Sequence, residues 1–137
     1  MHVKTMTNEH PDFYRLAGPF LSRREIVKEL GGPIWDEDGK LWFFAMRKGK
    51  VAGFATMTVK GQINVFQEAY VLPEYRGQGI HADLIDARIT HCQPGSTIET
   101  LIFNKSVDEY KARGFAVKRE VGKQWTEMQK TLEGAYA

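Results

Sequence analysis

The sequence predicts an α+β fold built on one mixed sheet, and three observations support that prediction. Apolar segments between residues 41 and 72 are separated only by short turns, as in an antiparallel meander of three strands. A helix and then another strand follow the meander, so we expect the fourth strand to lie parallel to the third. The chain of 137 residues has the usual size of one domain and can bury roughly two thirds of its unfolded surface.

Two helices are expected in the first third of the chain. His10-Pro11-Asp12 can open a helix that runs to about residue 16, before Gly18-Pro19 ends it. Ser22, with Glu25 three residues later, has the pattern of a capping box at the start of a second helix. A Gly-Gly-Pro sequence ends that second helix.

The remaining elements follow in the order strand, strand, strand, helix, strand, helix, strand, strand. The expected strands cover residues 41–46, 51–59, 63–72, 97–103, 115–120 and 124–132, the expected helices cover 79–91 and 104–113, and a first strand at 2–6 is optional. Pro73 ends the third strand of the meander because it cannot donate to a sheet ladder. We expect a single domain over residues 1–132 and a frayed tail over residues 133–137.

Composition excludes several classes of protein. The formal net charge of +2 is too small to indicate a nucleic-acid or membrane partner. The single cysteine, Cys92, excludes an intrachain disulfide, and the four histidines lack ligand spacing, so we expect no metal. The chain has no apolar run of about 18 residues, and its first residues lack the apolar core of a signal peptide. We therefore expect a soluble cytoplasmic protein, either a monomer or a homodimer.

The most informative segment runs from Arg76 to His81, between an apolar strand and an apolar helix. Its two glycines allow a ligand to approach the backbone closely, and the first N–H groups of the helix have no intrahelical partner. Such a turn favours a phosphate or pyrophosphate, and a solvated turn before an ordinary helix is the alternative. The segment lacks the Gly-Lys-Ser/Thr of a P-loop and the third glycine of a dinucleotide fold.

The same segment resembles the pyrophosphate motif of the GNAT acetyltransferase superfamily, Gln/Arg-x-x-Gly-x-Gly/Ala. Five positions comply, and His81 stands where that family has a small residue. The order of the expected elements is also the GNAT order. The resemblance implies the GNAT acyl-CoA N-acyltransferase fold, a mixed central sheet flanked by helices on both faces, with acetyl-CoA as co-substrate.

The resemblance also implies which residues contact the co-substrate. Backbone N–H groups of the turn, with Arg76 adding charge, would hold the pyrophosphate, while strand residues beside two separating parallel strands would hold the pantetheine arm. The implied contacts are Tyr70, Val71, Leu72, Arg76, Gly77, Gln78, Gly79, Ile80, His81 and Asn104. Tyr70, Val71 and Leu72 can at the same time belong to the core of the sheet.

Tyr110 is the expected general acid. The string from Tyr110 to Phe115 resembles the family's Tyr-x-x-x-Gly-Phe, whose tyrosine protonates the departing thiolate. An ordinary tyrosine is protonated at neutral pH and suits that role. The alternative is a tyrosine that only packs its helix onto the sheet. Asn104 lies six residues before Tyr110, whereas the family asparagine lies seven before its tyrosine.

Glu68 is the expected general base, although the family's usual carboxylate position is occupied by Gln67. Neighbouring strand residues face opposite sides of a sheet, so Glu68 can substitute only if a bulge redirects it. A partly buried, paired carboxylate is the equal alternative. Glu99 and Glu120 are further candidates, and water alone can serve in related enzymes.

These interpretations predict an acetyl-CoA-dependent N-acetyltransferase in which a primary amine of a small molecule or a protein attacks directly. A GNAT-fold binding or inhibitory protein with weak or no turnover is the alternative, indicated by His81, Gln67 and the shifted Asn104. A toxin-like acetyltransferase acting on aminoacyl-tRNA is a weaker alternative, because it would need a more basic surface.

Overall fold

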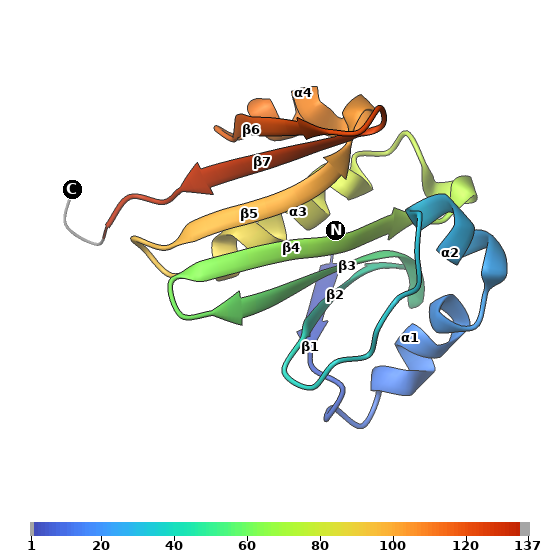
Figure 1. Cartoon of the computed structure of the whole chain (residues 1–137). Coiled ribbons are helices and arrows are strands. Elements are labelled where there is room, and N and C mark those ends of the chain that lie inside the picture. The colour runs from blue at the N-terminus through green and yellow to red at the C-terminus, as the bar shows by residue number, and fades with distance from the viewer. Residues whose placement is uncertain (1, 135–137) are drawn as a thin grey trace.

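The computed structural model describes residues 2–134 and contains a seven-stranded mixed sheet (Figure 1). Its strands are β1 (His2–Met6), β2 (Leu41–Arg47), β3 (Lys50–Lys60), β4 (Ile63–Val71), β5 (Thr97–Phe103), β6 (Ala116–Val121) and β7 (Trp125–Thr131). Their spatial order is β1-β2-β3-β4-β5-β7-β6, and only β4 and β5 are parallel neighbours. The mixed sheet, the parallel pair and the first strand are thereby confirmed.

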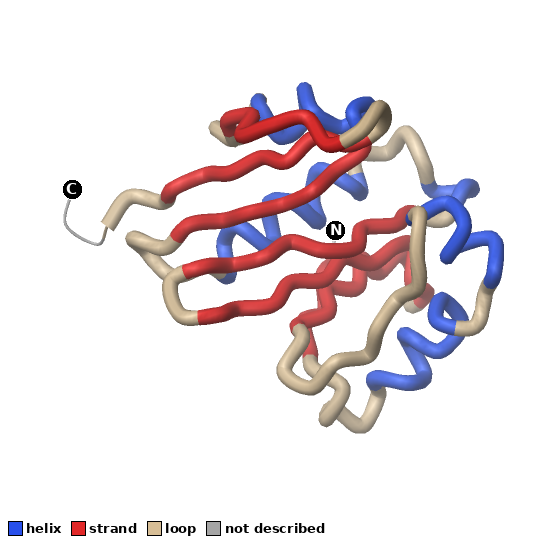
Figure 2. The backbone as a smooth tube through the Cα atoms, in the orientation of Figure 1, coloured by secondary structure: helices blue, strands red, loops and turns tan. Residues whose placement is uncertain are grey.

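Helices cover both faces of this sheet, as expected (Figure 2). They are α1 (Phe13–Leu21), α2 (Arg24–Leu30), α3 (Ile80–His91) and α4 (Val107–Lys111), with short 3-10 turns at Pro73–Tyr75 and Asn104–Ser106. The alternation of side chains along β2 builds two cores. Trp42 and Phe44 pack against α1 and α2, whereas Phe43 and Ala45 belong to the core beneath α3 and α4.

The structure corrects two expectations about the first helices. α1 runs through Gly18 and Pro19 to Leu21 instead of ending before them. A proline this close to the end of a helix removes only one backbone hydrogen bond, which the packing of α1 can offset. Ser22 does not cap α2, because its hydroxyl donates to the carbonyl of Gly18 (3.1 Å) and Arg23 is the N-cap.

The C-terminal part also differs in detail from the expectation. The expected helix over 104–113 is divided into the 3-10 turn and the short helix α4. Within the first residues of the expected tail, the Glu133 carbonyl accepts a hydrogen bond from the Gly95 N–H (2.9 Å). Residues 135–137 of the expected tail lie outside the described residues. No helix within residues 2–134 is long and apolar enough to cross a membrane.

Candidate active site

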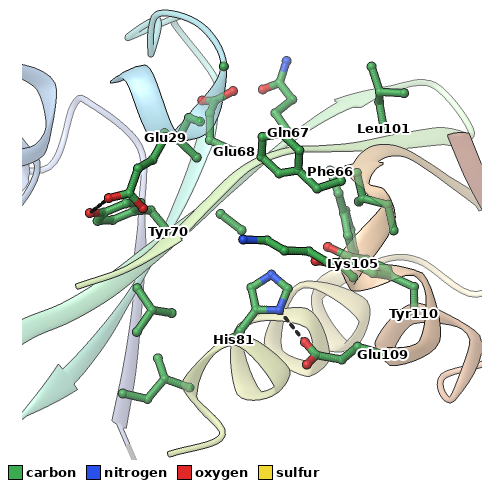
Figure 3. Close-up of a pocket in the computed structure, with 18 of the residues that line it drawn as sticks. Glu29, Phe66, Gln67, Glu68, Tyr70, His81, Leu101, Lys105, Glu109 and Tyr110 are labelled. Carbon is green, nitrogen blue, oxygen red and sulfur yellow. Dashed lines mark hydrogen bonds and ion pairs between the residues drawn. The ribbon is translucent and has the colours of Figure 1, made fainter. Parts of the chain in front are cut away.

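The parallel strands β4 and β5 separate partway along their length. Their pairing extends only to Phe66 opposite Thr100, although β4 continues to Val71 and β5 continues to Phe103. A cavity of about 720 Å³ opens here, and residues of both strands line it (Figure 3). The separation expected from the resemblance is therefore present, and it leaves backbone groups of β4 without a partner in β5.

Two backbone N–H groups of β4 point into this separation. The N–H of Leu72 donates to the Ala52 carbonyl of β3 (2.9 Å). Backbone groups alternate between the two sides of a strand, so the N–H groups of Val71 and Ala69 face the β5 side. The Val71 carbonyl faces that side too and accepts a hydrogen bond from Arg76 Nε (2.9 Å). The two N–H groups can therefore bind an extended ligand as an added strand would.

The expected phosphate turn borders the same cavity. Gly77 (φ +77°) and Gly79 (φ +80°) adopt the left-handed conformation that favours glycine, and Gly79 is the N-cap of α3. The first helical hydrogen bond joins the Asp83 N–H to the Gly79 carbonyl (3.0 Å). The N–H groups of residues 80–82 thus have no partner within the helix and are available to an anion.

The Arg76 side chain is directed toward α2. Its Nη2 donates to the Glu29 carboxylate (2.7 Å), and its guanidinium lies over the Tyr70 ring, 5.3 Å from the centroid. The Tyr70 hydroxyl also donates to Glu29 (3.4 Å), and burial together with this carboxylate raises the pKa of Tyr70. Arg76 therefore fixes α2 against the end of β4 at one wall of the cavity.

His81 joins α3 to α4 through a hydrogen bond between its Nδ1 and the Glu109 carboxylate (Figure 3). Burial lowers the pKa of His81, while Glu109 acts in the opposite direction. A neutral imidazole must then donate its Nδ1–H to Glu109, which leaves Nε2 as an acceptor. The bulky side chain in place of a small residue is thus held by α4, at the lining of the cavity.

Tyr110 lies on α4, and its side chain reaches the cavity from beneath the sheet (Figure 3). The residue is almost wholly buried, and its ring packs edge-on against Phe115 with centroids 5.2 Å apart. Its hydroxyl accepts a hydrogen bond from Arg88 Nη2 (3.2 Å). Tyr110 is therefore both a packing residue and a residue that lines the cavity.

A β-bulge redirects Glu68, as its expected role required. Gln67 and Glu68 together oppose the single residue Thr56 of β3, and the Glu68 N–H donates to Thr56 Oγ1 (3.0 Å). Glu68 Oε1 accepts hydrogen bonds from Thr56 Oγ1 (3.2 Å) and from Lys40 Nζ (2.5 Å). Lys40 is 1% exposed and also donates to the Trp35 carbonyl (2.8 Å). Glu68 is thus a paired carboxylate that also lines the cavity.

With this geometry established, comparison with known proteins assigns the family. Residues 18–132 match the family model described as an acetyltransferase (GNAT) domain. The chain belongs to the GNAT acetyltransferase family. Among curated proteins, no sequence match is found.

Solved structures support the same GNAT fold. ElaA of Escherichia coli superposes with a TM-score of 0.73 at 14% identity, covering 94% of this chain and 98% of that one. An acyl-CoA N-acyltransferase of Pseudomonas aeruginosa gives 0.74 at 12% identity, with coverages of 95% and 99%. The ribosomal-protein-S18-alanine N-acetyltransferase of Escherichia coli gives 0.65 at 15% identity, with coverages of 98% and 95%. At these identities the likeness establishes the fold.

Three of the residues expected to contact acetyl-CoA do not line the cavity between β4 and β5. Leu72 lines a smaller, separate pocket, and Gln78 belongs to the phosphate turn but does not line the cavity. The Asn104 amide donates to the Lys123 carbonyl (3.0 Å) and accepts from the Thr126 hydroxyl (2.7 Å). Both polar atoms of Asn104 are therefore bound to the turn and strand that follow, not directed into the cavity.

The two further carboxylates considered as bases do not line the cavity either. Glu99 accepts a hydrogen bond from Lys118 (3.2 Å) on the neighbouring hairpin. Glu120 is exposed on the edge strand β6. Glu68 is the one of these three carboxylates that the structure brings to the site.

Sequence reasoning missed four polar residues at or beside the site: Lys40, Arg88, Lys105 and Glu109. A signal for Arg88 was present, because it continues the series Ile80 and Leu84 at intervals of four, on the buried face of α3. Lys40 and Glu109 carry no such local signal, since their partners Glu68 and His81 are each 28 residues away.

The groups at the cavity fit acetyl-CoA. The N–H groups of residues 80–82 suit a pyrophosphate, and those of Ala69 and Val71 suit the amide-bearing arm. Lys105 lines the cavity and makes no ion pair with any residue from 2 to 134, so it is available to a phosphate. Within the same residues, no group of three or more His, Cys, Asp or Glu side chains is placed to hold a metal.

Gly79→Val is expected to weaken acetyl-CoA binding about tenfold or more. A β-branched residue at φ +80° is strained by roughly 1–2 kcal/mol and would also place methyl groups beside the pyrophosphate. Gly49 is the matched control, because it has φ +78° and open space around an added Cβ, as Gly79 does. Calorimetric titration should show parental affinity for Gly49→Val, and equal affinity for both variants would contradict the assigned turn.

The stability contribution of His81 is expected to fall as the pH falls below about 6.5. Its pKa is lowered in the folded chain, so the unfolded chain binds a proton at a pH where the folded chain does not. His81→Gln keeps a donor for Glu109 but does not titrate. Urea unfolding from pH 8 to pH 5 should show the parent losing stability relative to this variant. A constant difference across that range would show that His81 is not buried in its neutral form.

Proposed function

We propose that this GNAT protein is an acetyl-CoA-dependent N-acetyltransferase that transfers an acetyl group to a primary amine by direct attack. The observation that carries the proposal is that one cavity is lined by the phosphate turn, by Glu68 and by Tyr110. These groups come from three separate parts of the chain, and a carboxylate base and a phenolic acid at one site match what this reaction needs.

Each group has a defined part in the proposed reaction. The amine nitrogen attacks the thioester carbonyl carbon, so a C–N bond forms and the C–S bond breaks. Glu68, through water, takes the proton that the nitrogen loses, and Tyr110 gives its hydroxyl proton to the sulfur. The N–H groups of Ala69 and Val71 face the separation of the strands, where they can stabilise the negative charge that develops on the carbonyl oxygen.

The acceptor wall of the cavity favours an amine attached to an apolar group. The rings of Phe103 and Trp125 stack with centroids 4.1 Å apart, and both residues line the cavity. The loop after α2 closes over them, since a Cβ at Gly31 would lie 3.0 Å from the Trp125 ring. The Glu68 carboxylate lines the same cavity, where it would attract a cationic amine.

Acetyl-CoA titration followed by an acceptor screen tests the proposal. The panel should contain polyamines, amino acids, aminoglycosides and peptides with a free N-terminus, because one similar structure is named for a protein alanine acceptor. We expect micromolar acetyl-CoA binding and CoA release that depends on an amine. Binding without CoA release from any acceptor would instead support the binding or inhibitory alternative, and no binding would refute both.

A further inference from the structure

Arg88 of α3 is a fully buried cation without a carboxylate partner among residues 2–134. Its Nε donates to the Leu84 carbonyl (3.2 Å), Nη1 to the Thr56 carbonyl (3.4 Å) and Nη2 to the Tyr110 hydroxyl (3.2 Å). The guanidinium also lies over the Phe66 ring, 4.3 Å from its centroid. Each guanidinium nitrogen therefore has a hydrogen-bond partner, and the only side-chain oxygen among these is that of Tyr110.

This arrangement is costly if its purpose is packing alone. Removing a charged group from water is unfavourable, and an apolar side chain of similar volume commonly fills such a position with no loss of stability. The neighbours bound by Arg88 indicate another purpose. Thr56 is the residue opposite the bulge, and its hydroxyl holds Glu68, while Arg88 holds both the Thr56 carbonyl and Tyr110. Hydrogen bonds made by Thr56 and Arg88 therefore connect the proposed base, Glu68, to the proposed acid, Tyr110.

The hydrogen bond between Arg88 and Tyr110 can have only one direction. A guanidinium has donors and no acceptor, so the Tyr110 oxygen must accept from Arg88. The hydroxyl hydrogen must then point elsewhere, and no residue from 2 to 134 accepts it. Since Tyr110 lines the cavity, this hydrogen can be directed into the space where the thioester would lie.

We infer that Arg88 is a positioning residue that aims the Tyr110 hydroxyl proton into the cavity, an inference that rests on the proposed acid role of Tyr110. During transfer the proton moves from the tyrosine oxygen to the sulfur of the departing thiolate. The guanidinium behind the oxygen stabilises the negative charge left there until solvent returns a proton. Because Arg88 already orients the hydroxyl, the hydroxyl does not have to rotate at the moment of reaction.

A double-mutant cycle of Arg88→Met and Tyr110→Phe tests the inference. The measured quantity is single-turnover CoA release from bound acetyl-CoA with saturating glycinamide, a weakly basic amine, or with an acceptor found in the screen. Arg88→Met should lower this rate about 10- to 100-fold in the parent, the usual effect of a misplaced catalytic group. In the Tyr110→Phe background the same substitution should have almost no effect, and acetyl-CoA affinity should change less than about twofold.

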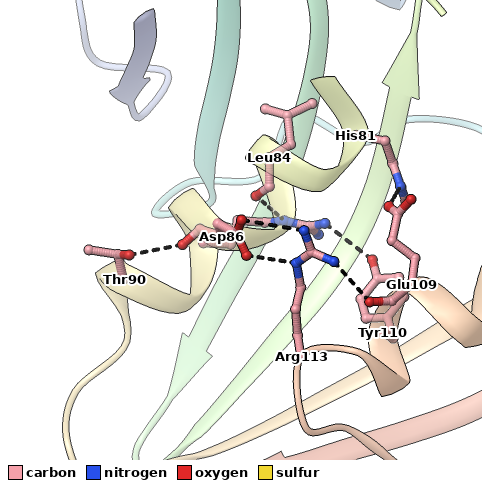
Figure 4. Close-up of polar contacts among 8 residues, drawn as sticks. His81, Leu84, Asp86, Thr90, Glu109, Tyr110 and Arg113 are labelled. Atoms are coloured by element: carbon pink, nitrogen blue, oxygen red, sulfur yellow. Dashed lines mark hydrogen bonds and ion pairs between the residues drawn. The ribbon is translucent and has the colours of Figure 1, made fainter. Parts of the chain in front are cut away.

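Arg113→Met is the matched control. Arg113 also connects α4 to α3, through hydrogen bonds to Asp86 (2.7 Å) and to the Glu109 carbonyl (3.0 Å) (Figure 4). Unlike Tyr110, it does not line the cavity. A loss of CoA release equal to that of Arg88→Met would show that Arg88 only docks the two helices. Arg88→Lys keeps a buried donor, so its rate of CoA release should lie between those of the parent and of Arg88→Met. If Arg88→Met does not fold, Arg88→Lys takes its place in the cycle.

The outcomes separate this inference from the proposed function. If Tyr110→Phe alone leaves the rate unchanged, the acid assignment fails, and the inference fails with it. Suppose that Tyr110→Phe lowers the rate, and that the Arg88 substitution lowers the rate of this variant by the same factor as it lowers that of the parent. Only the inference on Arg88 is then overturned. If the parent releases no CoA with any amine, the proposed function itself fails.

Discussion

Tyr110→Phe is expected to lower turnover by about two to four orders of magnitude, the usual contribution of a positioned general acid. The substitution keeps the ring that packs against Phe115 but leaves Arg88 Nη2 without its acceptor, so the fold should be retained at a cost of about 1–3 kcal/mol. The Michaelis constant for acetyl-CoA should change far less, because the proton is given only as the thiolate leaves. Steady-state kinetics with the acceptor found in the screen measure both quantities.

Tyr14→Phe supplies the control for that substitution. Tyr14 is 60% exposed on α1, and its hydroxyl donates to Asp36 (2.6 Å), away from the cavity. This variant should keep parental turnover. Parental turnover in the Tyr110→Phe variant would leave Tyr110 as a packing residue, and water would then be the proton source for the thiolate.

The elements that sequence could predict are those with a local signal. The sheet segments, the turn at Gly77 and Gly79 and the parallel pair follow from residues close together in the chain, through apolar patterning and turn chemistry. The bulge at Glu68 was anticipated only through the resemblance. The Thr56 hydroxyl, which accepts a hydrogen bond from the Glu68 N–H at the bulge, lies on the neighbouring strand and has no signature in the residues around Glu68.

The parts that sequence could not predict depend on contacts between distant segments. The end of α1 illustrates this, because Pro19 and Gly18 favour a break locally, but burial of Phe20 against Phe54 retains the helix. The partners of Arg88 lie 32 and 22 residues away, so its buried position on α3 can be inferred from spacing but its hydrogen bonds cannot. The direction of Asn104 was likewise decided by the turn and strand that follow it.

Lys40→Met is expected to destabilise the fold by about 2–3 kcal/mol, because it removes the cation that neutralises a mostly buried carboxylate. The side chains of Lys40 and Glu68 are 1% and 19% exposed, and the partial exposure of Glu68 keeps the loss below that of a wholly buried pair. Adding Glu68→Gln removes the unpaired charge, so the double variant should regain more than half of the lost stability. Urea unfolding of the parent, the two single variants and the double variant measures these differences.

The same variants separate the structural role of the pair from its proposed catalytic role. Lys60→Met is the matched control, since Lys60 is exposed at the end of β3 and should tolerate the change with little loss of stability. The double variant should remain poorly active despite its recovered stability, because an amide cannot take the proton from the amine. Full activity in the double variant would show that Glu68 serves the fold alone and that water accepts the proton. Equal stability of Lys40→Met and Lys60→Met would show that the Lys40–Glu68 contact contributes nothing to folding.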